Sequence, residues 1–129
     1  MSHRTLLAGG PRVGKTTLSL RLAAEAGIIA RGTDELIKQG VKFQDGPAEV
    51  AKWFLAPGPW VIEGVHTTRA LRIWLKENAT GLPFDRMFWG GEPKVTRTKW
   101  QESCAKGINT VWQGIEAELL ARGALVQRF

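Results

Sequence analysis

The residues with the clearest chemical meaning lie near the start of the chain, in the run GGPRVGKT at Gly9–Thr16, hereafter the glycine loop. Its glycines let the backbone turn N–H groups inward, where they can surround the oxygens of a phosphate. Lys15 adds a mobile cation, and the hydroxyl of Thr16 is of a type that ligates Mg²⁺. The spacing G-x-x-x-x-G-K-[ST] is typical of a loop that cradles a polyphosphate.

Such a loop needs a strand before it and a helix after it. Residues 4–8 are short and apolar, which predicts a buried strand, and residues 15–26 have helical apolar spacing with Gly27 at the end. The start of that helix would direct its positive end at the bound anion. With this setting the chain resembles the P-loop NTPase and kinase superfamily, most specifically over residues 4–26.

The resemblance implies that a nucleoside triphosphate binds here with Mg²⁺. ATP is the expected nucleotide, and GTP is not excluded, although the Asn-Lys-x-Asp signature of GTPases does not occur in the chain. The expected nucleotide-binding residues are Gly9, Gly10, Pro11, Arg12, Val13, Gly14, Lys15, Thr16 and Thr17.

Along the rest of the chain, short apolar segments alternate with amphipathic ones. This alternation predicts an α/β fold, with a parallel sheet of about five strands covered by helices on both faces. We expect a single three-layer domain over residues 1–129, and the resemblance implies the strand order 2-3-1-4-5. The expected strands are 4–8, 28–30, 60–62, 86–89 and 124–126. The expected helices are 15–26, 35–39, a stretch from 46, one that is capped by Thr67 or Thr68 and runs to 76, and 100–121.

Composition sets broad limits on the class of protein. The chain has 129 residues, one cysteine and no apolar run long enough to cross a membrane, so we expect a cytoplasmic protein. Its formal charge is +6 at pH 7. That charge is compatible with simple solubility, with an anionic substrate, or with a nucleic-acid surface.

Asp34 is the first candidate for the chemistry beyond the glycine loop. The segment Gly32–Ile37 resembles the equivalent segment of chloramphenicol phosphotransferase, shikimate kinase and polynucleotide kinase. In those families an Asp here binds or deprotonates the acceptor hydroxyl, which implies that role for Asp34. The alternative is that Asp34 only caps the helix expected at 35–39.

Glu63 is the second candidate. Trp60–Val65 resembles the third strand of adenylate kinase and its relatives, where an acidic residue at the strand end holds Mg²⁺ through water. The resemblance implies that Glu63 assists Thr16 as a metal ligand, with the alternative that Glu63 is the catalytic base. Arg69 and Arg72 follow on the next helix, where nucleotide kinases place an Arg that reaches an acceptor phosphate.

The basic, glycine-rich 90–99 loop lies where these kinases carry a lid. A lid brings a cation onto the transferring phosphoryl group and excludes water. Arg97 is the first candidate for that cation, followed by Lys94 and Lys99, and the alternative is a solvated basic loop. Trp100, beside the loop, could stack on a base.

Together these residues predict an ATP-dependent phosphotransferase that moves the γ-phosphate of Mg-ATP to a hydroxyl or phosphate acceptor. Lys15, Asp34 and Arg97 are the expected catalytic residues. Two alternatives stay open: a nucleic-acid-directed P-loop enzyme, such as an end kinase or a phage DNA-processing accessory, and a nucleotide-gated binding protein with little turnover. The acceptor, the base specificity and the oligomeric state are not encoded in any motif.

Overall fold

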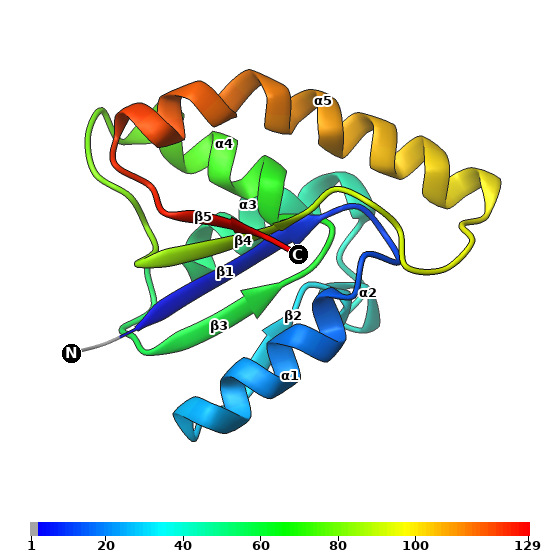
Figure 1. Cartoon of the computed structure of the whole chain (residues 1–129), viewed down its shortest axis with the longest axis horizontal. Coiled ribbons are helices and arrows are strands. Elements are labelled where there is room, and N and C mark those ends of the chain that lie inside the picture. Colours follow the sequence, from blue (N-terminus) through cyan, green and yellow to red (C-terminus); the bar gives the residue numbers. More distant parts are fainter. Residues whose placement is uncertain (1–2) are drawn as a thin grey trace.

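Five short strands form one parallel sheet in the order β2-β3-β1-β4-β5 (Figure 1). The computed structural model describes residues 3–129. The strand order agrees with the prediction, and it places β1 between β3 and β4 at the centre of the sheet. The strands are β1 (Arg4–Gly9), β2 (Ala30–Gly32), β3 (Trp60–Glu63), β4 (Arg86–Gly90) and β5 (Val126–Arg128).

Helices connect the strands, as the alternating pattern predicts. All the expected helices form, and the structure adds a short 3-10 helix, η1, that the sequence pattern did not indicate. None of the helices within residues 3–129 is both long and apolar enough to cross a membrane. The helices are α1 (Lys15–Ala26), α2 (Asp34–Lys38), η1 (Phe43–Asp45), α3 (Gly46–Trp53), α4 (Thr67–Glu77) and α5 (Lys99–Ala121).

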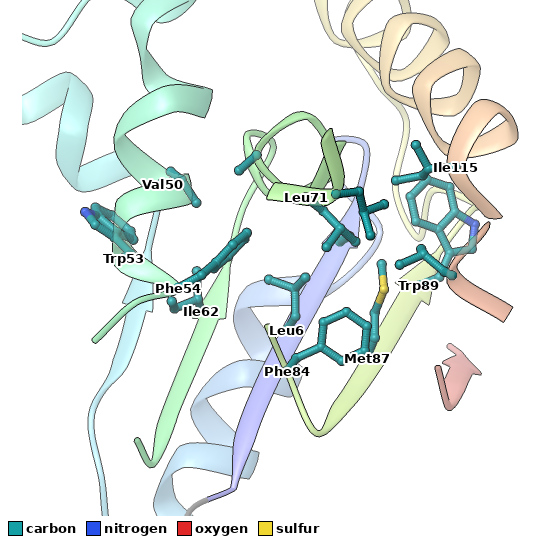
Figure 2. Packing of buried hydrophobic residues seen from close by; sticks show 14 of the residues in the cluster. Leu6, Val50, Trp53, Phe54, Ile62, Leu71, Phe84, Met87, Trp89 and Ile115 are labelled. Carbon is teal, nitrogen blue, oxygen red and sulfur yellow. The ribbon is translucent and has the colours of Figure 1, made fainter. Parts of the chain in front are cut away.

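Alternating residues of the central strands belong to two separate hydrophobic clusters, one on each face of the sheet. Leu6 and its same-face neighbours pack under α3, α4 and α5, as Figure 2 shows for Leu6, Val50 and Leu71. Leu7, on the opposite face, packs with Leu22 of α1. Because successive side chains of a strand point to opposite faces, both faces of the sheet are buried under helices. The predicted three-layer α/β architecture is confirmed.

Two strands lie further along the chain than predicted. β2 begins at Ala30 rather than at residue 28, and β5 begins at Val126 rather than at residue 124. In both places the apolar residues after a helix-ending glycine still belong to the helix terminus, because Ile28 N donates to Ala23 O (2.9 Å) and Ala124 N donates to Leu119 O (3.0 Å). These bonds give the last helix carbonyls a donor, and each strand therefore begins two residues later in the sequence than predicted.

The structure does not support the alternative that Asp34 caps the helix expected at 35–39. Thr33 occupies the N-cap position, and Asp34 is the first residue of the helix. A carboxylate in the first turn interacts favourably with the positive end of a helix. Asp34 is therefore not the N-cap residue.

Gly64 fixes the end of β3, because its φ of 139° is one that residues with a Cβ rarely adopt. A Cβ at this position would overlap the side chain of Thr33. The Gly64 carbonyl also accepts a hydrogen bond from the Thr67 hydroxyl (2.8 Å) at the start of α4. The absence of a Cβ at Gly64 thus lets the Thr33 side chain, which follows β2, pack against the end of β3.

We predict that Gly64→Ala lowers the free energy of unfolding by about 3 kcal/mol, through backbone strain and overlap with Thr33. Gly123→Ala is the matched control: its φ is 87°, but a Cβ there meets nothing within 4 Å. The control should lose only about 1 kcal/mol, from strain alone. Urea denaturation measures both, and equal losses would show that the contact with Thr33 contributes nothing.

Candidate functional site

The glycine loop joins the end of β1 to the start of α1 and packs closely against β4 and α5. A Cβ on Gly9 would overlap the Gly90 carbonyl of β4, and a Cβ on Gly10 would lie 2.8 Å from the Cβ of Ala105 on α5. Gly14, at the helix start, has a φ of 95°. Glycine is therefore required in this loop by close backbone approach and by backbone conformation.

Lys15 is buried, with 6 % of its surface exposed. Its ammonium group donates a hydrogen bond to the carbonyl of Gly10 (2.5 Å), so the side chain curls back over its own loop. Burial lowers the pKa of Lys15 from 10.5 to about 8, and the nearby carboxylates of Glu63 and Asp34 partly oppose that shift. The charged ammonium group is thus incompletely solvated, and an anion would stabilise it.

Glu63 is the last residue of β3 and lies between β1 and β2. Its carbonyl accepts from Thr33 N (2.9 Å), and its carboxylate approaches Gly32, where a Cβ would lie 2.7 Å from Oε1. Burial raises the pKa of Glu63, Lys15 lowers it, and Asp34 raises it further. The sheet therefore holds a poorly solvated carboxylate near Lys15.

The two acidic residues that begin α2 have different surroundings. Glu35 forms an ion pair with Arg31 (Oε1 to Nε, 2.7 Å), and the Arg31 guanidinium lies 3.6 Å from the centre of the Trp53 ring. Asp34 takes part in none of the ion pairs found within residues 3–129, and its side chain is exposed. Of this pair, Asp34 is the carboxylate available to a ligand.

The predicted 90–99 loop is shorter in the structure, because Gly90 ends β4 and Lys99 begins α5, and it lies along the glycine loop. Arg97 Nε donates to the carbonyl of Pro11 (2.7 Å), and Lys94 N donates to the carbonyl of Arg12 (2.7 Å). Only 4 % of the Arg97 side chain is exposed, and its Nη1 lies 3.9 Å from Glu102. Thr98 ends the loop by capping α5 through a reciprocal pair of bonds with Gln101.

These elements surround a cavity of about 730 Å³, hereafter the main cavity. It lies at the carboxyl ends of the parallel strands, where open α/β sheets bind ligands. Arg69 and Arg72 are not among its lining residues: Arg72 is exposed, and Arg69 packs against α5, where a Cβ on Gly107 would lie 2.5 Å from its Nη2. The lining residues are Pro11, Arg12, Gly14, Lys15, Thr16, Thr17, Asp34, Ile37, Phe43, Glu63, Gly64, Val65, Lys94, Val95, Trp100 and Gln101.

A second cavity of about 460 Å³, hereafter the side cavity, adjoins the first and shares Gly14, Thr17 and Lys94 with it. Its other lining residues are Val13, Leu18, Arg21 and Phe129. Sequence reasoning missed Leu18 and Arg21, although Arg21 follows Thr17 by four residues and so shares its helix face. Phe43 and Val65 of the main cavity were also not predicted as site residues, because no recognisable sequence motif gives either of them a role.

The residues present fit a divalent cation that arrives with a nucleotide. Within the described part of the chain, no group of three or more His, Cys, Asp or Glu side chains could hold a metal ion by itself. Thr16 and Glu63 nevertheless line the same cavity. Because Mg²⁺ is usually held through one or two protein ligands together with substrate phosphates, this sparse set is sufficient.

Comparisons with known proteins add no assignment. Neither the protein-family models nor the curated proteins compared with this chain match it. Any function proposed for the chain therefore depends on the geometry and charges of the main cavity and its surroundings.

We predict that Glu63→Gln raises Tm at pH 7 by about 2–5 °C, because it removes a half-buried carboxylate whose ionised form is disfavoured by the fold. A raised folded-state pKa means that stability is lost as pH rises through that pKa, so the difference should shrink below the ordinary value of 4.5. Calorimetry at several pH values measures it, with the exposed Glu92→Gln as control. A lower Tm for Glu63→Gln at pH 7 would contradict the assigned environment.

Proposed function

We propose that the protein binds a nucleoside triphosphate with Mg²⁺, ATP by expectation, and transfers its γ-phosphoryl group to an acceptor. The observation that carries this proposal is the convergence of the glycine loop, Lys15, Glu63 and Asp34 on one cavity. A buried cation at the start of a helix favours phosphate oxygens, and the two carboxylates supply the groups that metal binding and acceptor orientation require.

The nucleotide would extend from the main cavity into the side cavity. The glycine loop and Lys15 hold the β- and γ-phosphates, so Lys15 exchanges its hydrogen bond to Gly10 for bonds to phosphate. The side cavity then receives the base, with Phe129 and Leu18 as apolar contacts and Arg21 as a cation that can stack on a ring. Mg²⁺, bound to phosphate oxygens near Thr16 and Glu63, would neutralise charge on the transferring group.

In the transfer step, an acceptor oxygen forms a bond to the γ-phosphorus. The bond from that phosphorus to the bridging oxygen breaks, and its electron pair leaves on the nucleoside diphosphate. Where the acceptor is a hydroxyl group, its proton passes to the carboxylate of Asp34. Asp34 suits this role because it lines the cavity near Lys15 without an ion-pair partner among residues 3–129.

Arg97 would support the loop that holds the phosphates. Its bond to Pro11 O keeps a buried guanidinium group beside Gly10, where a Cβ would lie 3.0 Å from Nη2. Arg97 is not among the residues that line the main cavity, so its positive charge would act from behind the glycine loop and not by contact with the transferring group.

The test is transfer of label from γ-labelled ATP with Mg²⁺ to pooled acceptors: nucleosides, nucleoside monophosphates, small alcohols and 5′-hydroxyl oligonucleotides. We expect transfer to one pool by the wild-type protein. Lys15→Met should lose ATP binding, while Asp34→Asn should bind ATP normally and transfer about 100-fold more slowly to a hydroxyl acceptor. Lys76→Met, an exposed change on α4, is the matched control and should leave both properties unchanged.

Two outcomes would contradict the proposal. ATP binding that survives Lys15→Met would mean that the glycine loop does not hold the phosphates. ATP binding that depends on Lys15, but with no transfer to any pool, would favour a nucleotide-gated binding protein instead.

A further inference from the structure

The main cavity has an apolar and aromatic wall in addition to its charged residues. Single exposed apolar side chains are common, but large apolar side chains that gather in a hollow indicate a ligand-binding surface. Four of the five residues in this wall are exposed, Val65 being half-buried. The wall consists of Ile37, Phe43, Val65, Val95 and Trp100.

Two rings of this wall are held at a fixed angle to each other. Phe43 of η1 and Trp100 of α5 meet edge to face, with ring centres 5.7 Å apart. Phe43 in turn lies on the buried ring of His66, with ring centres 4.6 Å apart. Yet 62 % of Trp100 is exposed, so most of its indole is open to a ligand. A planar ring can stack there on a side chain that is already positioned.

The cations of the main cavity belong to its glycine-loop end. Arg12 and Lys15 are part of that loop, and Lys94 is bonded to it through its backbone and also lines the side cavity. Arg69, which sequence reasoning assigned to an acceptor phosphate, packs against Gly107 of α5 and does not line the cavity.

The triphosphate would therefore bind the cations that line the cavity. The charged residue that remains next to the aromatic wall is then Asp34. An acceptor that already carries a phosphate would meet a carboxylate there and find no further lining cation. An uncharged acceptor avoids that repulsion.

This inference rests on the phosphotransferase function proposed above and specifies its acceptor. We propose that the acceptor is a small, neutral, hydroxyl-bearing molecule with a planar aromatic ring that stacks on Trp100 beside Phe43. Its hydroxyl oxygen forms the bond to the γ-phosphorus, the bridging oxygen leaves with the nucleoside diphosphate, and the hydroxyl proton passes to Asp34. Free nucleosides and small aromatic alcohols share this chemistry.

The test compares transfer rates for five acceptor classes: nucleosides, aromatic alcohols, nucleoside 5′-monophosphates, aliphatic alcohols and 5′-hydroxyl oligonucleotides. We expect kcat/KM to be highest for one of the two neutral aromatic classes, and the comparison of those two identifies the source. Trp100→Ala should raise the KM of that acceptor at least about ten-fold, while the KM for ATP stays unchanged. Trp100→Phe should restore most of the affinity, because it keeps a ring. Leu55→Ala removes an exposed apolar side chain outside the cavity and should change neither KM.

Binding without turnover gives a second readout. A neutral aromatic acceptor, added with MgADP, should quench Trp100 fluorescence in the wild-type protein, and this component should be missing in Trp100→Phe. Absence of quenching would contradict the inference.

Preference for monophosphates, aliphatic alcohols or 5′-hydroxyl oligonucleotides over neutral aromatic molecules would overturn the inference but leave the phosphotransferase proposal in place. An unchanged acceptor KM in Trp100→Ala would do the same. By contrast, an ATP affinity that is unchanged in Lys15→Met would overturn the proposed function itself.

Discussion

The ammonium group of Lys15 is buried against the carbonyl of Gly10, within the electrostatic influence of the carboxylates of Glu63 and Asp34. Burying a charge is costly unless it is compensated, and the lowered pKa of Lys15 records that cost. The bond to Gly10 O compensates in part. An anion with several oxygens would compensate the buried charge more fully, which is the basis of the role proposed for Lys15.

Sheet topology explains why the acidic residues come to the same place. β1 is central, and its neighbour β3 ends at Glu63, while β2 ends next to Glu63 and leads through Thr33 to Asp34. Because the strands are parallel, their carboxyl ends meet at one edge of the sheet. Residues far apart in sequence therefore converge on the main cavity without any direct local signal.

The elements that depend on local interactions could be predicted from the sequence. The strand, glycine loop and first helix follow from one motif and its periodicity, and the strand order follows from the resemblance that this motif carries. The predicted starts of β2 and β5 were wrong, because apolar residues such as Ile28 complete a helix terminus instead of starting a strand. The sequence also could not indicate that Arg69 packs on Gly107, or that Phe43 meets Trp100, since both contacts depend on how α5 lies across the fold.

The most direct test of the role given to Lys15 is the pKa of its ammonium group, measured by NMR on lysine-labelled protein with and without MgATP, and assigned with Lys15→Arg. We predict a pKa of about 8 in the free protein, rising to the ordinary 10.5 or above when MgATP binds, because phosphate oxygens stabilise the charged form. A Lys15 pKa that does not change on addition of saturating MgATP would contradict that role, since the ammonium group would then not contact the phosphates.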